Sequence, residues 1–260
     1  MSSLIEYRQP ESSHWSDVEG RPRYEADLRM ARKEHLFPSV TSILSIKDKP
    51  QLTSWKIGQV VSQALTMTRN AGESDDDFLA RVFEADKVER AKAPDLGTAA
   101  HKALADYLST GRSPEEKKMR ILVGAQIEWI DKHVEKSRRD VEYHFTYPHL
   151  GYSGCIDAQC VVDGRPAHID WKTQETKAKY NYKVAFWPEW CSQLVAYAAG
   201  DMDMDLYSIV IDTAVPGQFH EPHLWSVEDK KWSWMLFLAL RDAWIADRRY
   251  DPRVTEELPF

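Results

Sequence analysis

The sequence predicts a mixed α/β (α+β) fold, a central β-sheet with helices packed against it. Three observations lead to this expectation. Apolar residues recur at helical spacing in the first half of the chain and again near its end. A block of alternating strand-like segments lies between residues 141 and 171. From about residue 95, the order of elements is helix, helix, three strands, helix, two strands and helix, which is typical of one layered domain.

Composition excludes several other classes of protein. The 260 residues are 43% hydrophobic and 29% charged, close to globular averages and unlike a disordered or collagen-like chain. No apolar run approaches the roughly 18 residues of a membrane span, and the N-terminus has no apolar signal segment. Three cysteines without a CxxC pair argue against a disulfide framework or a zinc site. We therefore expect a cytoplasmic protein with no membrane association.

The first half of the chain is predicted to be helical. Residues 1–36 are polar and lack periodicity, so we interpret them as a loosely structured arm. A β-branched run from Val40 to Ile46 follows, and it ends before Pro50. A capping box at residues 113–116 predicts the start of one of the helices. Four helices are expected here: one from about residue 52, one over about 76–92, one from about 95 to 110, and one ending near 137.

The second half is predicted to form the sheet. Strands are expected over 141–147, 151–162 and 166–171, and the last two are joined by a tight Asp163-Gly164 turn. Pro188 begins a helix that runs to residue 199, and strands over 206–213 and 219–225 follow. Ser226 and Asp229 form a capping box for a final amphipathic helix. Its predicted apolar face consists of Trp232, Met235, Ala239 and Ala243.

Two carboxylates and a lysine on the predicted hairpin suggest a metal-dependent catalytic site. Asp157 belongs to one strand, and Asp170 ends the next. On paired strands these two carboxylates can share one cation, and hard oxygen ligands suit Mg²⁺ or Mn²⁺. Lys172 is two residues after Asp170 and so projects from the same face of the strand. A metal-bound carboxylate beside an ammonium group is what phosphodiester hydrolysis requires.

Flanking residues extend this set. Gly97-x-x-x-His101 lies on a predicted helix upstream of the hairpin, and Gly154 precedes Asp157 by three residues. Gln193 and Tyr197 are four apart on the next helix and therefore share a face. Each residue alone has an ordinary interpretation, because a lone histidine or tyrosine is usually a packing residue. The four patterns in this order and on these elements form a much more specific signal.

The ordered set GxxxH, GxxD, DxK and QxxxY resembles the RecB-type branch of the PD-(D/E)XK nuclease superfamily. That branch includes the nuclease domain of bacterial recombination helicases and phage and mitochondrial genome-maintenance exonucleases. The resemblance covers residues 95–200 by motif, and the segment PSVTSIL extends it to about residue 37. It implies a restriction-endonuclease-like core, with a central mixed β-sheet flanked by helices, and an N-terminal helical extension. The implied divisions are an arm (1–36), the extension (37–94), the nuclease core (95–250) and a tail (251–260).

Carried over by position, the resemblance implies roles for individual residues. Lys172 would be the catalytic lysine, acting with Asp157 and Asp170. One or two Mg²⁺ or Mn²⁺ ions would be held by His101, Asp157, Asp170 and the backbone carbonyl of Trp171. Glu142 stands where some relatives place another acid, and Gln193 and Tyr197 would brace the site or contact the strand. The four cysteines of an iron–sulfur cluster found in some members are not present, so no such cluster is expected.

A lysine- and tyrosine-rich segment follows the DxK motif. Lysines suit phosphates and tyrosines suit bases, so we expect this segment to bind a strand beside the site. The net charge of -7 argues against a protein that mainly coats nucleic acid, so a local basic rim of this kind would be needed. The expected substrate-binding residues of the segment are Lys177, Lys179, Tyr180 and Lys183.

We therefore expect a metal-dependent DNA exonuclease of recombination, repair or phage DNA processing. Its partners would be a DNA single strand or duplex end and a recombination or replication protein, in a bacterial or phage-infected cell. Two alternatives stay open. The chain could be a catalytically silent nucleic-acid-binding module of nuclease fold. It could also be a non-haem iron oxygenase that uses His168, Asp170 and His220 (or His223), because two histidines and a carboxylate are that class's ligand set.

Overall fold

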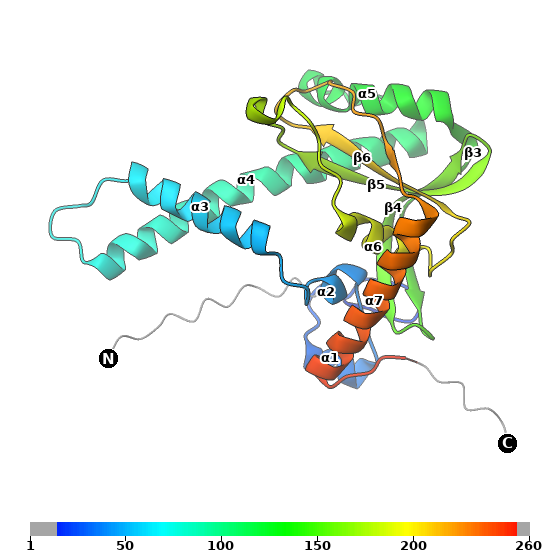
Figure 1. Cartoon of the computed structure of the whole chain (residues 1–260), viewed down its shortest axis with the longest axis horizontal. Helices are drawn as coiled ribbons and strands as arrows, with labels where there is room; N and C mark the ends of the chain where they lie inside the picture. The colour runs from blue at the N-terminus through cyan, green and yellow to red at the C-terminus, as the bar shows by residue number, and fades with distance from the viewer. Residues whose placement is uncertain (1–14, 254–260) are drawn as a thin grey trace.

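The computed structural model describes residues 15–253, except for the side chains of 51, 52, 55, 89–95, 137, 138 and 179. The fold is a mixed α+β arrangement with one central sheet (Figure 1). The helices are α1 (Leu28–Glu34), α2 (Val40–Leu44), α3 (Pro50–Thr66), α4 (Asp75–Thr110), α5 (Lys117–His133), α6 (Pro188–Tyr197) and α7 (Val227–Arg248). The strands are β1 (Trp15–Ser16), β2 (Phe37–Pro38), β3 (Val134–Tyr147), β4 (Tyr152–Val162), β5 (Arg165–Gln174), β6 (Asp205–Asp212) and β7 (His223–Leu224).

The central sheet has the strand order β3-β4-β5-β6-β7. Only the β5–β6 pair is parallel, and α6 forms the crossover between these two strands. The other neighbours in the sheet are antiparallel, so the sheet is mixed, as the sequence predicts. The parallel pair begins a crevice where β5 and β6 both end, the usual place for a site in such sheets.

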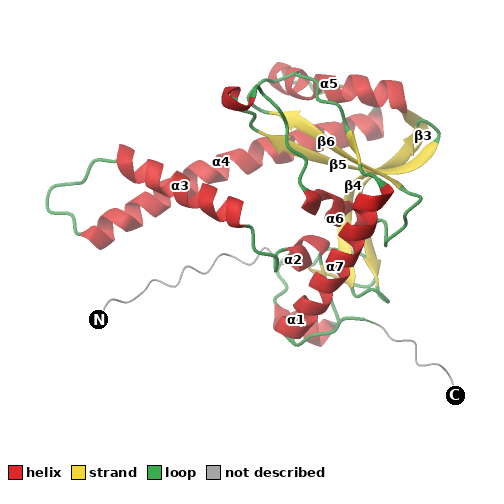
Figure 2. Ribbon diagram, in the orientation of Figure 1, coloured by secondary structure: helices red, strands yellow, loops and turns green. Residues whose placement is uncertain are grey.

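Helices cover both faces of the sheet (Figure 2). One hydrophobic core lies under α4 and α5 and includes Ile169 and Trp171 of β5. The other lies under α6 and α7 and includes Leu194, Phe237 and Trp244. Because successive side chains of a strand point to opposite faces, Asp170 and Lys172 face α6 while Trp171 faces α4 and α5.

α4 is one continuous helix of 36 residues, where the sequence predicts two. The predicted start is right, since Ser74 accepts a hydrogen bond from the Asp77 N–H at 3.1 Å. The predicted break near Asp95 is wrong. A proline within a helix removes one backbone hydrogen bond and strains one turn, but good helix formers lie on both sides of Pro94. The first part of α4 and all of α3 form a hairpin that projects from the rest of the molecule (Figure 1).

The capping box predicted at residues 113–116 does not form. α5 begins at Lys117, its N-cap is Glu116, and no side chain caps it. Instead the Arg120 guanidinium donates to the carbonyl oxygens of Pro114 and Glu115. The helix also ends at His133 rather than near 137, because the chain passes directly into β3.

The β4–β5 hairpin matches the prediction closely. Asp163 and Gly164 have φ values of 48° and 81°, as a two-residue hairpin turn with two left-handed positions requires. β5 runs three residues beyond the predicted end, to Gln174. The predicted strand over 219–225 is reduced to the two residues of β7.

α7 has the predicted capping box, with Ser226 and Asp229 bonded reciprocally. The predicted apolar face is wrong, however, because Trp232 and Met235 are 62% and 60% exposed. The helix has two apolar stripes, and the opposite one, with Phe237 and Trp244, packs in the core against α6, α2 and Tyr152 of the sheet. Spacing alone cannot tell which of two such stripes is buried.

The interpretation of 1–36 as a loose arm is wrong for residues 15–36. Trp15, Ala31 and Leu36 are buried in the core under α7, and Asp27 caps α1. Residues 1–14 lie outside the described part of the chain, as do residues 254–260.

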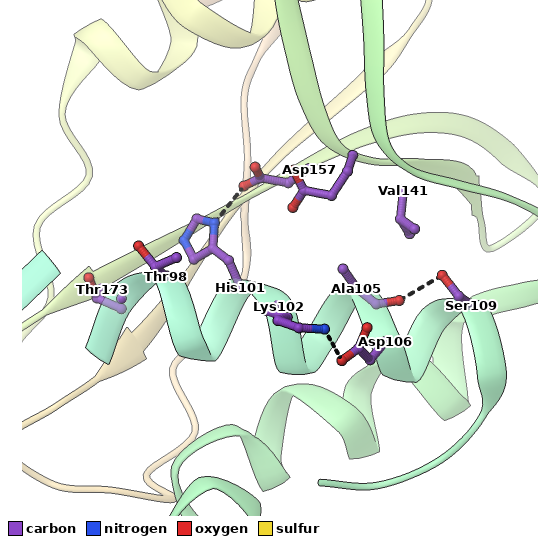
Figure 3. A pocket seen from close by; sticks show the side chains of 11 residues that line it. Thr98, His101, Lys102, Ala105, Asp106, Ser109, Val141, Asp157 and Thr173 are labelled. Atoms are coloured by element: carbon purple, nitrogen blue, oxygen red, sulfur yellow. Dashed lines mark hydrogen bonds and ion pairs between the residues drawn. The ribbon is translucent and has the colours of Figure 1, made fainter. Parts of the chain in front are cut away.

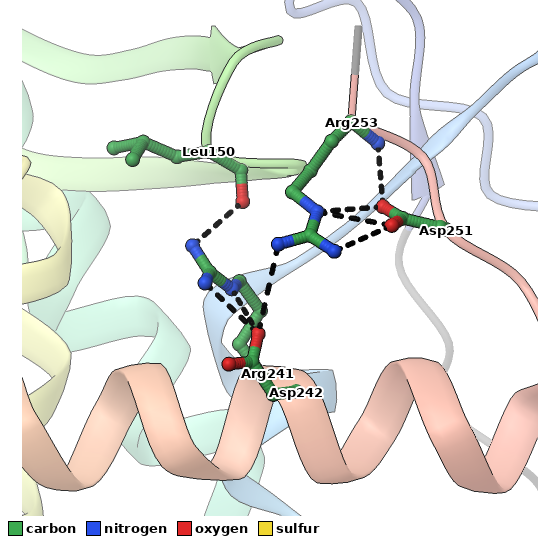
Figure 4. A network of polar contacts seen from close by, with 5 residues as sticks. All are labelled: Leu150, Arg241, Asp242, Asp251 and Arg253. Carbon is green, nitrogen blue, oxygen red and sulfur yellow. Dashed lines mark hydrogen bonds and ion pairs between the residues drawn. The ribbon is translucent and has the colours of Figure 1, made fainter. Parts of the chain in front are cut away.

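The end of α7 is tied to the β3–β4 turn by a polar network (Figure 4). Arg241 donates to the Leu150 carbonyl at 3.3 Å, and Arg253 pairs with both Asp251 and Asp242. These contacts fix the C-terminal segment against the hairpin that carries Asp157. Among the described helices, none has the length and apolar character needed to cross a bilayer.

Candidate active site

The β4–β5 hairpin brings the two predicted carboxylates together. Asp157 and Asp170 lie one residue beyond the ladder pair Ala158–Ile169. Asp157 Oδ2 accepts a hydrogen bond from the Trp171 backbone N–H at 2.9 Å. The Asp157 carboxylate is therefore held directly beside the peptide that follows Asp170.

A chain of polar contacts leads from Asp170 to α6. The Lys172 ammonium lies 2.7 Å from Asp170 Oδ2 and donates to Gln193 Oε1 at 2.9 Å. Gln193 in turn donates to the Tyr197 hydroxyl at 2.6 Å. The predicted shared faces of Asp170 with Lys172 and of Gln193 with Tyr197 are thus confirmed, and one connected network contains all four side chains.

His101 of α4 approaches the same place from the other side. Its Nδ1 lies 3.4 Å from Asp157 Oδ2, as Figure 3 shows. His101, Asp157 and Glu142 line a cavity of about 720 Å³ between α4 and strands β3 and β4. Gly97, Thr98 and Thr173 form the end of this cavity nearest to β5. His101 and Asp157, but not Asp170 or Lys172, therefore line a cleft beside the site.

Close packing explains why the GxxxH and GxxD motifs each begin with a glycine. A Cβ on Gly154 would lie 2.6 Å from Phe145 Cζ and 2.9 Å from Tyr197 Cε1. A Cβ on Gly97 would lie 3.2 Å from Thr173 Oγ1, so this glycine lets α4 approach β5. Both glycines thus set the distance between elements that carry site residues.

Burial and charge perturb the acid and the histidine. Burial raises the pKa of Asp170; the Lys172 ammonium opposes this shift, and the Asp157 charge adds to it. Burial alone would lower the pKa of His101, but its contact with Asp157 and the charge of Asp170 outweigh burial and raise that pKa. The raised pKa of His101 reflects the negative charge of the two neighbouring carboxylates.

The residues fit a hard divalent cation. Asp170 Oδ2 is buried, lies 2.7 Å from the Lys172 ammonium and has no further partner among the described groups. Two carboxylates and an imidazole are a donor set that accepts Mg²⁺ or Mn²⁺. As the side chains are placed, the described residues contain no group of three His, Cys, Asp or Glu side chains that could hold a metal ion.

Other predicted site residues lie around this centre. Glu142 is exposed on β3, lines the cavity, has a φ of 47° and accepts a weak hydrogen bond from the Cys155 thiol at 3.5 Å. Lys177, Tyr180 and Lys183 are exposed on the loop after β5. The side chain of Lys179 is outside the described set. The roles of these residues stay predictions.

The oxygenase ligand set is not assembled. His220 Nε2 lies 3.2 Å from Asp212 Oδ2, and among the described side chains the ion-pair partner of Asp170 is Lys172 rather than His220. His168 is buried at 3% exposure, its Nδ1 has no hydrogen-bond partner among the described groups, and burial lowers its pKa to about 4. Neither histidine is therefore arranged as a ligand beside Asp170.

Two residues near the site were missed by sequence reasoning. Gln174 and Asp212 end the parallel strands β5 and β6 and face each other in register. The signal that could have found them is a polar residue directly after an apolar strand, at the edge where parallel strands both end.

Comparisons with known proteins identify no family for this chain. The sequence matches no protein-family model, and no curated protein matches it either. The geometry of the site is therefore the basis for inferring what the chain does.

Proposed function

We propose that this chain is a metal-dependent deoxyribonuclease with a restriction-endonuclease-like core, acting as an exonuclease. One observation carries the proposal. Four segments far apart in the sequence supply His101, Asp157, the Asp170–Lys172 pair and Gln193 to a single network beside one cavity. A set of ion pairs that merely stabilises a sheet has no need of a histidine, a half-buried lysine and an open cleft together.

Lys172 is suited to act on the attacking water. An ammonium group has three donors, and two of them face Asp170 and Gln193. The third is available to a water molecule or a phosphate oxygen. Gln193, itself held by Tyr197, keeps the ammonium from rotating away. Lys172 would then orient the water and offset the charge that develops on the phosphate.

Asp157, Asp170, His101 and the Trp171 carbonyl would hold the cation. When bound, Mg²⁺ or Mn²⁺ polarises the phosphate and lowers the pKa of a water ligand. Asp157 is already oriented for this by the Trp171 N–H. The exposed lysines and tyrosines of the loop after β5 would bind the strand, with Lys177, Tyr180 and Lys183 as the described members.

A gel assay on end-labelled DNA tests the proposal. The substrates are 5′- and 3′-labelled single strands, duplexes and circles, each incubated with Mg²⁺, Mn²⁺ or EDTA. Lys172→Ala is compared with Lys231→Ala, an exposed lysine on α7 that none of the site contacts involves. We expect metal-dependent degradation of linear DNA that is lost in Lys172→Ala and kept in Lys231→Ala.

The other outcomes separate the alternatives. Cleavage of circles would keep the nuclease site but make it an endonuclease. DNA binding without cleavage under every condition would support the silent binding module instead. Equal cleavage by both lysine variants would remove Lys172 from the mechanism.

A further inference from the structure

The loop between β5 and α6, residues 175–186, is closed at its base by one side chain. The Gln174 carboxamide donates to the Ala185 carbonyl at 2.5 Å and accepts from the Ala185 N–H at 3.1 Å. These two hydrogen bonds have the same pattern as the pair that the backbone of a neighbouring strand would form with Ala185. The ends of the loop are thus joined two residues after Lys172.

Asp212 anchors the first turn of this loop from the neighbouring strand. It is 1% exposed, and its carboxylate accepts from the Thr176 hydroxyl at 2.6 Å and from the Ala214 N–H at 2.9 Å. His220 Nε2 lies 3.2 Å from the same carboxylate, and weaker contacts come from the N–H groups of Thr176 and Val215. A buried carboxylate is tolerated only when its oxygens are satisfied, and here each oxygen has at least two partners.

Asp205, at the other end of β6, provides an internal comparison for Asp212. Asp205 begins β6, is 8% exposed and forms an ion pair with Arg165 at 2.7 Å. Its hydrogen bonds do not reach the loop. Both acids stabilise the ends of β6, but only Asp212 connects the strand to the segment that carries Lys177, Tyr180 and Lys183.

We propose that Asp212, acting through Thr176, is a positioning residue that holds the 175–186 loop beside Lys172 so that the loop can bind the nucleic-acid strand. Asp212 touches none of the reacting groups. Its contribution is to order the loop before substrate arrives, which reduces the entropy lost on binding. The substrate part of this inference rests on the proposed nuclease function, whereas the ordering of the loop does not.

The test uses the full chain and two matched comparisons. Thr176→Val keeps the size of the side chain but removes the donor to Asp212, and Thr176→Ser keeps that donor. Asp212→Asn is compared with Asp205→Asn at the far end of the strand. Hydrogen–deuterium exchange of peptides covering 175–186 reports loop order, and KM and kcat on a labelled single strand report binding and chemistry separately.

We expect loop amides to exchange about tenfold faster in Thr176→Val and Asp212→Asn. KM should rise about tenfold, the effect of losing roughly one stacked base, with kcat changed less than twofold. Thr176→Ser and Asp205→Asn should behave like the wild type in both measurements.

Three outcomes would contradict the inference or part of it. Unchanged exchange in Thr176→Val would overturn the anchoring role whether or not the protein is a nuclease. Faster exchange with an unchanged KM would overturn the link between loop order and substrate binding. A wild type that cleaves nothing would reject the proposed function and with it the substrate part, while the exchange result would still decide the anchoring.

Discussion

Replacing Gly154 by alanine tests how closely the site depends on the packing beneath it. The added Cβ would lie 2.6 Å from Phe145 Cζ and 2.9 Å from Tyr197 Cε1, distances that real Cβ atoms do not tolerate. Both rings are buried at 5% exposure and pack edge to face with centroids 5.6 Å apart. Neither ring can therefore swing into solvent, and one of them must shift within the core.

The expected cost follows from this overpacking. Extra methyl groups in a well-packed core cost about 1–3 kcal/mol. For a chain of this size, each kcal/mol lowers the melting temperature by about 2–4 °C, so we expect a loss of about 2–12 °C. Displacement of Tyr197 would also disturb Gln193, its partner at 2.6 Å, and through Gln193 the Lys172 ammonium. Cleavage should therefore fall by more than the unfolded fraction explains.

A second glycine provides the control. Gly124 lies inside α5, and a Cβ added there would have nothing within 4 Å, so Gly124→Ala should stabilise the protein by about 0.5–1 kcal/mol. Differential scanning calorimetry on both variants and the wild type measures the two effects, with cleavage assayed well below the transition. If Gly154→Ala melts at or above the wild-type temperature, the steric reasoning about this motif glycine is wrong.

Three further predictions concern the charged groups. In Lys172→Ala we expect no cleavage but a larger Mn²⁺-induced rise in melting temperature than in the wild type, because the cation no longer competes with the ammonium for Asp170. In His101→Ala the same Mn²⁺-induced rise should shrink; an unchanged rise would remove His101 from the ligand set. The third concerns Asp212. Burial acts to raise its pKa, but hydrogen bonds from Thr176, Ala214 and His220 outweigh burial and lower it below the ordinary 3.8. The stability contributed by this ionised group is therefore present above that value and lost as the pH falls through the lower folded pKa. The difference in urea stability between the wild type and Asp212→Asn should accordingly be larger at pH 7 than at about pH 3.

Local signals predicted the parts of the fold that local chemistry decides. The Asp163-Gly164 turn and the Ser226–Asp229 capping box depend on a few adjacent residues, and both form as predicted. The buried face of α7 was not predictable in this way, because both its stripes are apolar and the sheet selects the one with Phe237. Likewise, the continuation of α4 through Pro94 depends on more than the proline itself.

The same distinction between local and long-range information applies to the candidate site. The shared face of Asp170 and Lys172 follows from the two-residue period of a strand, and that of Gln193 and Tyr197 from the helical period. The contact between Asp157 and the Trp171 N–H depends on the register of two strands, which a turn sequence constrains only indirectly. The role of Asp212 depends on a crossover that places β6 beside β5, and no local pattern encodes it.

The balance of charge distinguishes this site from an ordinary buried ion pair. At the far end of β6, Asp205 has one guanidinium partner, and the pair is complete with one positive and one negative charge. At the site, Asp157 and Asp170 share one ammonium and a histidine whose pKa their own charges raise. When that histidine is neutral, the group carries an excess negative charge in a partly buried place, which is unfavourable unless a cation is bound. Asp157 lines a cleft of about 720 Å³, so a cation and the phosphate that accompanies it have a route to this carboxylate.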